Sequence, residues 1–230
     1  MSQQLRRVAT ARISASALIL FALGLTLTDT SGLVPDRAID LLGYYTLQAN
    51  VIALAVWVAS VIASTRTTSA KTQRALEYAR AFAVANLVLV AILYWAMIAP
   101  LGLVSGTRLA TVMVISHIVT PIYASIDFLV VGPAEPLPMR GWWWFFAIPT
   151  AWLSVAIPRA YAGGWVPYDY LDPTRGWRAI VGTVSLQGLL LAALAVAALR
   201  IRWWRSVAHF QLAEADSDDS ISLDLDRAVA

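Results

Sequence analysis

Long apolar segments separated by short polar ones dominate the chain. They span residues 13–28, 41–63, 75–101, 109–131, 142–157 and 177–199. Their lengths of about 16 to 27 residues bracket the ~20 residues that an α-helix needs to cross the hydrocarbon core of a bilayer. The segments are too long and too evenly apolar for the alternating strands of a membrane β-barrel. The pattern therefore predicts an all-α fold, a polytopic membrane protein with a bundle of six transmembrane helices.

Proline and glycine mark several of the expected helix ends. The fourth segment ends at Gly132 and Pro133, and the fifth is interrupted by Pro149 and ends at Pro158. The first segment follows a basic stretch, but no Ala-x-Ala-like site closes it. We therefore expect a retained helix there and not a cleaved signal peptide.

Composition agrees with a membrane protein. Hydrophobic residues make up 59% of the chain, charged residues 13%, and mean hydropathy is +0.67. Cysteine is absent, which excludes disulfides, thiolate metal sites and a cysteine nucleophile. The net charge of +3 is small, and the basic residues cluster beside apolar segments. We interpret them as signals that orient the protein in the membrane and not as a surface that binds nucleic acid.

Arginine and lysine gather on one side of the expected bundle. If the N-terminus lies in the cytoplasm, twelve of the 17 Lys and Arg residues fall in cytoplasmic segments and the other five in external ones. That excess of positive charge predicts a cytoplasmic N-terminus, and six spans then place the C-terminus there too. Residues 211–230 are rich in Asp and Ser. They predict an acidic, disordered tail after a transmembrane domain of residues 1–210.

His117 is one of only two histidines and lies within the apolar segment 109–131. An ionisable ring within a membrane is costly, normally faces the bundle interior or a water-filled cavity, and is a candidate functional residue. From the outer end of its helix, His117 lies roughly 13 Å deep at 1.5 Å per residue. Pro121 follows four residues later, where it frees the carbonyl of residue 117 and permits a kink that widens a cavity beside the ring.

The stretch 44–50, Tyr-Tyr-Thr-Leu-Gln-Ala-Asn, is unusually polar for a membrane span. Thr46 lies about 9 Å down its helix, so it can share a layer with His117. Asn50 follows four residues later and projects from the same helix face as Thr46. Further polar side chains nearby are those of Tyr45 and Gln48.

These residue types suit nucleophilic acyl transfer. A threonine hydroxyl needs a base within hydrogen-bond reach, and His117 is the only base in the membrane region with an ordinary pKa near neutrality. The Asn50 amide suits orienting a group or donating to an oxyanion. A substrate that reaches this depth from the bilayer is a lipid ester or amide. Taken singly, such residues also have structural roles, because membrane threonines bond nearby carbonyls and asparagines join helices.

Two other polar features admit simpler interpretations. Asp127 lies ten residues beyond His117, roughly 15 Å deeper and too far to complete a triad. We interpret it as an interfacial carboxylate or as the interhelical partner of an inner arginine. The loop 163–176 is either an interfacial loop or a cap over the outer mouth of the His117 cavity. In that loop Asp172 precedes Pro173 and suits starting a turn or capping the last helix.

Three short segments resemble the androgen-induced protein family. Residues 45–50 resemble its aromatic-Thr-x-x-x-Asn signature, and 116–121 resemble its His-x-x-x-Pro signature. Residues 167–173 resemble the Pro-Tyr-x-Phe-Leu-Asp segment of its bacterial integral-membrane branch, with Tyr170 in place of phenylalanine. The resemblance implies a hydrolase of fatty acid esters of hydroxy fatty acids in a bacterial plasma membrane. It implies Thr46 as the nucleophile, His117 as the general base, and no metal or other cofactor.

The favoured hypothesis is therefore an intramembrane lipid esterase, with Thr46 and His117 catalytic and a membrane lipid as substrate. The residues expected to support the site or bind substrate are Asn50, Tyr45, Gln48, Pro121, Tyr170 and Asp172. No nucleic-acid or protein partner is indicated. The alternatives are a non-enzymatic carrier or sensor that binds a lipid-like small molecule, and a structural protein whose polar residues only join helices. The lack of an inverted repeat and of a charged chain across the bilayer disfavours transport.

Overall fold

The computed structural model describes residues 3–29, 41, 43–101, 107, 109–132, 137–201 and 204, and these contain helices and turns but no strand. The all-α prediction is confirmed for this part of the chain. Five helices are long and apolar enough to cross a membrane, namely Gln3–Leu27, Tyr45–Ser64, Ala70–Leu101, Ala110–Val130 and Trp177–Ile201. The acidic tail and the expected boundary at residue 210 lie outside the described residues.

The first helix, α1 (Gln3–Leu27), begins ten residues before the expected apolar segment at residue 13. The apolar pattern does not indicate its first turns, because they are polar. The next helix is α3 (Tyr45–Ser64). Two later helices change their hydrogen-bonding pattern along their length. In chain order their parts are α4 (Ala70–Leu93), the π-helix η1 (Tyr94–Ile98), the 3-10 turn η2 (Ala99–Leu101), α5 (Ala110–Val114), the π-helix η3 (Ile115–Val119) and α6 (Thr120–Val130).

The fifth apolar segment differs from its prediction. A 3-10 helix, η4 (Met139–Phe146), leads directly into α7 (Ala147–Tyr161). The expected interruption at Pro149 is wrong, because the chain stays helical through this residue. Pro149 lies in the first turn of α7, where a residue needs no N–H to bond an earlier carbonyl of the same α-helix, so proline costs little there. The expected end at Pro158 is also wrong, since α7 continues to Tyr161 and loses little so near its end. A 3-10 helix rises about 2.0 Å per residue and an α-helix about 1.5 Å, so η4 is about 16 Å long and α7 about 22 Å long.

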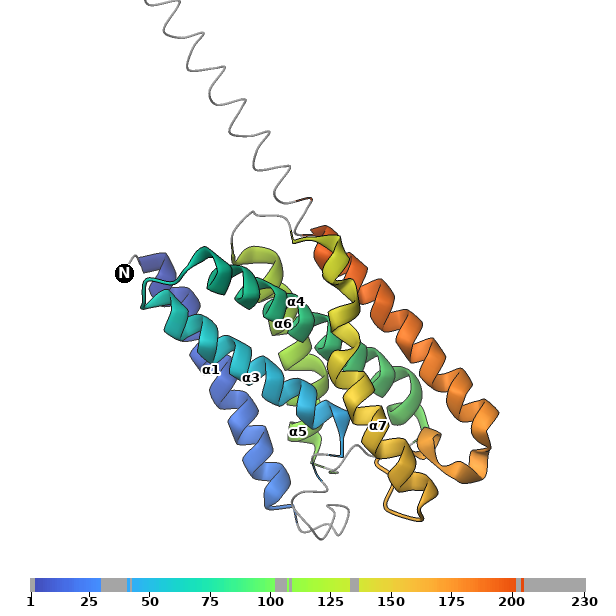
Figure 1. The fold of residues 1–230 in the computed structure, drawn as a ribbon. Helices are drawn as coiled ribbons and strands as arrows, with labels where there is room; N and C mark the ends of the chain where they lie inside the picture. Colours follow the sequence, from blue (N-terminus) through green and yellow to red (C-terminus); the bar gives the residue numbers. More distant parts are fainter. Residues whose placement is uncertain are drawn as a thin grey trace, which may run out of the picture.

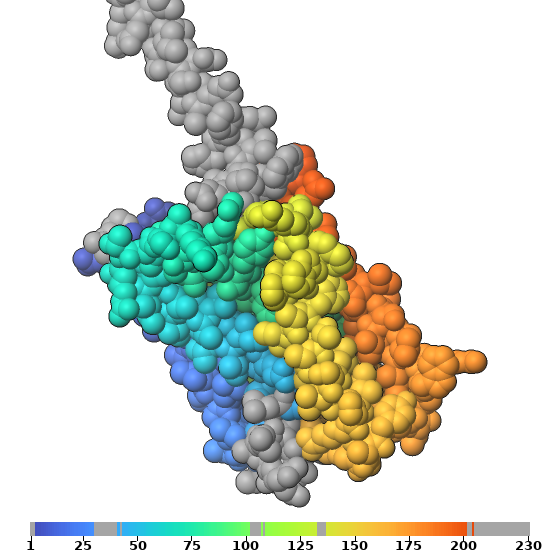
Figure 2. All heavy atoms as spheres, in the orientation of Figure 1, coloured from blue at the N-terminus to red at the C-terminus, as the bar shows by residue number. Residues whose placement is uncertain are grey.

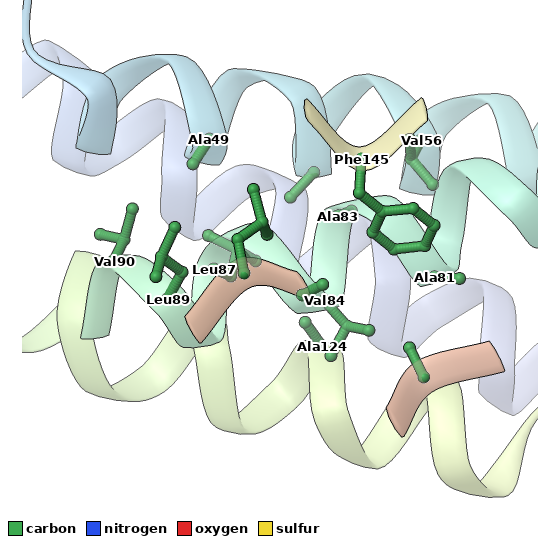
Figure 3. Packing of buried hydrophobic residues seen from close by; sticks show 14 of the residues in the cluster. Ala49, Val56, Ala81, Ala83, Val84, Leu87, Leu89, Val90, Ala124 and Phe145 are labelled. Atoms are coloured by element: carbon green, nitrogen blue, oxygen red, sulfur yellow. The ribbon is translucent and has the colours of Figure 1, made fainter. Parts of the chain in front are cut away.

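The helices form a layered bundle (Figure 1). α3 packs against α1 on one side and α4 on the other, and α4 packs against α6. Small residues make these close approaches possible, because Ala49, Ala53 and Ala81 are at most 1% exposed. Figure 3 shows Ala49 of α3 above the larger core side chains of α4, among them Leu89, and Ala81 of α4 beside the Phe145 ring of η4. In the space-filling view α7 (yellow) covers the middle of one face, between α3 (cyan) and the C-terminal helix Trp177–Ile201 (orange) (Figure 2).

Large apolar side chains point away from the core on several helices. Leu20 on α1, Ile126 on α6 and Leu189 on the C-terminal helix are 57%, 54% and 70% exposed. A protein surrounded by water rarely exposes apolar side chains on so many faces. This surface, together with the five long apolar helices, is compatible with an integral membrane protein.

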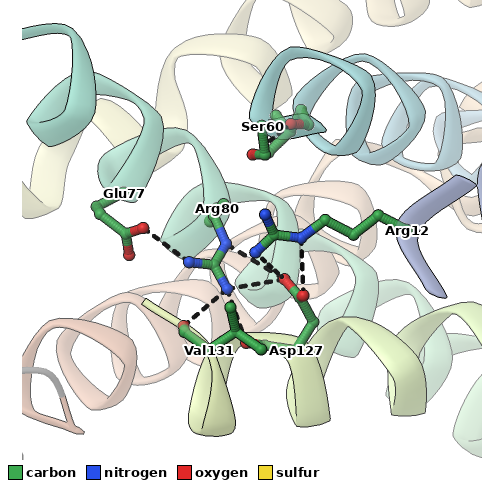
Figure 4. A network of polar contacts seen from close by, with 7 residues as sticks. Arg12, Ser60, Glu77, Arg80, Asp127 and Val131 are labelled. Atoms are coloured by element: carbon green, nitrogen blue, oxygen red, sulfur yellow. Dashed lines mark hydrogen bonds and ion pairs between the residues drawn. The ribbon is translucent and has the colours of Figure 1, made fainter. Parts of the chain in front are cut away.

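A buried ion cluster joins three helices near the end of the bundle that holds the N-terminus (Figures 1 and 4). Asp127 on α6 accepts from Arg12 Nε of α1 at 2.9 Å and from Arg80 Nη2 of α4 at 2.8 Å. Arg80 also donates to Glu77 at 2.7 Å. Two guanidinium groups thus meet two carboxylates, which compensates every charge in the cluster. The interpretation of Asp127 as an interhelical partner of arginine is confirmed, and no bond links it to His117.

Candidate active site

Thr46 and His117 meet in the core. Thr46 is the second residue of α3, and His117 lies at the centre of the π-helix η3. The Thr46 Oγ1 and His117 Nε2 atoms are 3.4 Å apart. Both residues are buried, with Thr46 8% and His117 1% exposed. The structure therefore brings together the two residues that the sequence selected from different helices, at the looser hydrogen-bond distance that such pairs often have without a ligand.

A backbone carbonyl fixes the orientation of the His117 ring. His117 Nδ1 lies 3.1 Å from Met113 O, one turn earlier on the same helix. A carbonyl oxygen only accepts, so Nδ1 carries the hydrogen in this bond. In the neutral ring Nε2 is then the unprotonated nitrogen, and it faces the Thr46 hydroxyl. This is the tautomer that a general base needs.

The expected effect of Pro121 on the helix is visible in the backbone. Pro121 cannot donate to the carbonyl of His117, and Trp95 Nε1 of η1 donates to that carbonyl at 3.3 Å instead. Ahead of the proline, Thr120 N–H bonds Ile115 O, five residues earlier, which is the widened π turn that holds His117. Tyr94 of η1 stacks on the His117 ring with centroids 3.8 Å apart. Two π-helices thus meet at the site, where such turns often occur in functional proteins.

Asn50 links the nucleophile to the helix that carries the base. Its Nδ2 donates to Thr46 O at 2.9 Å, and its Oδ1 accepts from Thr120 Oγ1 at 2.8 Å. Asn50 is 3% exposed and both ends of its amide are occupied. Its amide therefore fixes α3 against α6, and these two bonds use one of the two Nδ2 hydrogens.

Tyr168, which was not selected from the sequence, completes the hydrogen-bonded group. It precedes the short 3-10 turn η5 (Asp169–Leu171) in the loop after α7. Its hydroxyl accepts from Thr46 N–H at 3.3 Å and lies 3.3 Å from Thr46 Oγ1. The Thr46 N–H belongs to the first turn of α3. Tyr168 contacts both this N–H and the Thr46 hydroxyl with one oxygen.

Two cavities adjoin Thr46. The larger one, about 220 Å³, lies between α3, α4, α7 and the C-terminal helix, and its wall includes Leu89, Val90, Leu153 and Leu191. The smaller one, about 30 Å³, is shared by Thr46, Asn50 and His117. It has room for about one water molecule. Thr46 lines both, so it lies between the larger chamber and the small one that it shares with Asn50 and His117.

The other predicted site residues are distributed unevenly. Tyr45 and Tyr170 line the larger cavity, and the Tyr45 hydroxyl donates to Asn86. Gln48 is half-buried on α3 and lines neither cavity. Asp172 lies apart from the cavities and accepts from the Thr174 side chain at 2.7 Å and the Thr174 N–H at 2.8 Å. These bonds hold the pKa of Asp172 below its usual value and make it the cap of the 3-10 turn η6 (Pro173–Arg175).

The residues missed by sequence reasoning left signals of different strength. Met113 lies four residues before His117, so helical periodicity could have identified its carbonyl as the partner of the ring. Tyr168 and Tyr170 alternate in one loop, and nothing local tells which of them reaches α3. The stacking of Tyr94 on His117 joins residues 23 positions apart and has no signal in the sequence.

Comparison of the chain with models of protein families, with curated proteins and with solved structures finds no match. In the part of the chain that the structure describes, no group of three or more His, Asp or Glu side chains is placed to hold a metal ion. The candidate site is therefore supported by its geometry alone, and the relation of the chain to a known family remains a prediction.

Proposed function

We propose that this protein is an intramembrane lipid esterase with Thr46 as nucleophile and His117 as general base. The observation that carries the proposal is the 3.4 Å approach of Thr46 Oγ1 to His117 Nε2, with the opposite ring nitrogen bonded to Met113 O. A hydroxyl–imidazole bond alone also serves to join helices, so the apolar cavity beside Thr46 is the second support for the proposal.

The reaction follows from this arrangement. His117 Nε2 takes the Thr46 proton while Oγ1 attacks the ester carbonyl carbon. The tetrahedral intermediate collapses, the bond to the alcohol oxygen breaks, and His117 returns the proton to that oxygen. Water then attacks the acyl-threonine, with His117 as base again, and releases the carboxylic acid and the Thr46 hydroxyl. The small cavity shared by Thr46 and His117 suits this water.

Tyr168 is the donor best placed for the developing oxyanion. Its oxygen accepts from Thr46 N–H and lies 3.3 Å from Thr46 Oγ1, a position from which the phenol can donate to a substrate oxygen at Thr46. Donors fixed before the reaction stabilise the charge that forms in the transition state. The role of Asn50 in the proposal is to hold α3 to α6.

A lipid substrate fits the surroundings of the site. The larger cavity is mostly apolar and suits an acyl chain, and the outer faces of the helices suit immersion in lipid. We extend the proposal to six spans, with the η4–α7 unit as the sixth, and to cytoplasmic termini. In the described residues, nine Lys or Arg residues lie toward the end that holds the N-terminus and three toward the other end (Figure 1).

The direct test is hydrolysis of a medium-chain p-nitrophenyl ester by the purified protein in lipid nanodiscs. Thr46→Val removes the hydroxyl with little change of shape, and His117→Gln removes the base. We expect each to lower kcat by about 10³-fold or more, because a nucleophile and its base act as a unit. Thr111→Val, at an exposed position on α5, is the matched control and should keep full activity.

Hydrolysis that survives in both Thr46→Val and His117→Gln would refute the proposal. Saturable lipid binding by a wild-type protein that hydrolyses no ester would instead identify a carrier or sensor. Loss of folding in both variants, judged by gel filtration, would leave wild-type hydrolysis and its inhibition by a fluorophosphonate as the deciding measurement.

A further inference from the structure

The larger cavity contains a buried donor without an acceptor. Gln187, on the C-terminal helix, lines the cavity that Thr46 also lines. The Gln187 Nε2 atom is excluded from solvent and has no hydrogen-bond partner among the described residues. Buried amide nitrogens in proteins are nearly always paired. An unpaired one on a cavity wall therefore points to an acceptor that arrives with a ligand.

A second donor lies beside it. The Gln187 side chain lies close enough to the Tyr170 hydroxyl to interact with it, which lowers the pKa of Tyr170, but burial has the larger effect and raises that pKa well above its ordinary value. The phenol therefore keeps its proton through the physiological pH range. The other tyrosine hydroxyls on this wall have partners within the protein, Asn86 for Tyr45 and Thr46 for Tyr168. Gln187 and Tyr170 are thus two neighbouring wall residues that can serve a ligand, and Thr150 also lines the cavity. We name the pair the Gln187–Tyr170 subsite.

The surroundings of this subsite define what it can accept. Leu191 and Val184, one turn to either side of Gln187 on the same helix, also line the cavity. No lysine or arginine lines it. A carboxylate or phosphate buried there would lack a compensating charge, whereas one neutral oxygen can accept from both donors.

We propose that the cavity binds acyl chains that carry one neutral oxygen, as a hydroxyl, ether or keto group, and that the Gln187–Tyr170 subsite recognises this oxygen. The inference rests on the proposed esterase function, in which the acyl carbonyl lies at Thr46. The substrates are then esters of oxygenated fatty acids. A cavity of 150 Å³ holds a benzene ring, so the 220 Å³ here encloses a segment of about eight or nine carbon atoms.

An oxygen scan of the acyl chain tests the proposal. The probes are p-nitrophenyl esters of a straight ten-atom acyl chain, either all carbon or with one CH₂ replaced by an ether oxygen at successive positions. We expect kcat/KM to be highest with the oxygen at one position or two adjacent ones, about tenfold above the all-carbon ester. Tenfold is what one net hydrogen bond gained on binding provides.

Variants separate hydrogen bonding from cavity shape. Gln187→Met keeps a side chain of similar length without the donor and should abolish the preference for oxygen while all-carbon ester hydrolysis continues. Gln73→Met, at an exposed position on α4, is the matched control and should retain the preference. Gly188→Ala adds a methyl group whose nearest neighbour is the Phe146 ring at 3.9 Å. It should disfavour long chains and leave the oxygen preference in place.

The outcomes distinguish this inference from the proposed function. A wild-type protein that hydrolyses all esters equally, or a Gln187→Met variant that keeps the oxygen preference, would overturn the subsite and leave the esterase intact. If the wild type hydrolyses no ester, the esterase proposal fails. The subsite is then tested by preparing the same chains as methyl ethers and measuring how far each one raises the melting temperature of the protein. Greater stabilisation by one oxygenated chain, lost in Gln187→Met, would support it, and equal stabilisation would overturn it.

Discussion

Three contacts of Thr46 serve different requirements of the proposed acyl transfer. His117 Nε2 lies at 3.4 Å as the base, Tyr168 Oη at 3.3 Å as a donor, and the Asn50 amide holds the Thr46 carbonyl at 2.9 Å. The order of importance follows from the chemistry. The base is indispensable, the donor stabilises charge, and the amide fixes position.

Replacing Tyr168 by phenylalanine tests the second contact. Tyr168→Phe keeps the ring that packs against Tyr44 and Tyr170 and removes only the hydroxyl. We expect kcat to fall about 10²-fold with little change in KM, because the loss concerns the transition state more than the bound ester. Tyr161→Phe, at a tyrosine that is 54% exposed, should have no effect. An unchanged kcat in Tyr168→Phe would remove Tyr168 from the mechanism and leave the Thr46–His117 pair standing.

The sequence identified the pair at this scale but not its partners. Residue type and helical depth were enough to select Thr46 and His117, since few polar side chains in apolar segments share a layer. Tyr168 reaches α3 through the fold of a loop, and the sequence favoured its neighbours Tyr170 and Asp172. Loop conformation depends on contacts that are distant in sequence, so local rules could not choose among these residues.

At the scale of elements, the Arg12–Asp127–Arg80 cluster holds α1, α4 and α6 together. Removing the central carboxylate leaves the buried Arg12 guanidinium without its counter-charge and Arg80 with Glu77 alone. Breaking a buried pair in this way typically costs about 3–5 kcal/mol. We therefore expect Asp127→Asn to lower the free energy of unfolding in detergent by about 3 kcal/mol or more. The exposed pair of Asp169 with Arg175 provides the control. Asp169→Asn should cost less than about 1 kcal/mol.

A contradictory result for this cluster would be equal destabilisation by Asp127→Asn and Asp169→Asn. Equality would mean that the ion pairs contribute no more than a surface pair and that apolar packing alone sets the helix arrangement.

Helix positions were predictable from the apolar pattern, whereas their internal geometry was not. The segment 109–131 corresponds closely to the helix Ala110–Val130, but its π turn at Ile115–Val119 was not expected. A π turn is unfavourable in isolation. Here Trp95 donates to the His117 carbonyl within the turn, and Tyr94 stacks on the His117 ring. The part of α1 that precedes the expected segment also has a tertiary contact, because Arg12 donates to Asp127 on another helix.

At the scale of the whole molecule, the proposed orientation places the Asp127 cluster on the cytoplasmic side and the loop of Tyr168 on the external side. The absence of cysteine makes this directly testable. We expect Ala162→Cys, at the end of α7, to react with a membrane-impermeant maleimide in intact cells. Thr67→Cys, between α3 and α4, should react only after the membrane is opened. Both positions are exposed in the structure. The reverse labelling pattern would invert the topology.

The central claim is that Thr46 forms a covalent bond with substrate. Its most direct test is peptide mass spectrometry of the protein after reaction with a lipid-like fluorophosphonate. The account predicts a phosphonyl adduct on Thr46 in the wild-type protein and in Thr111→Val, and no adduct in His117→Gln. An adduct on another residue, or ester hydrolysis by a protein that forms no adduct at Thr46, would contradict it.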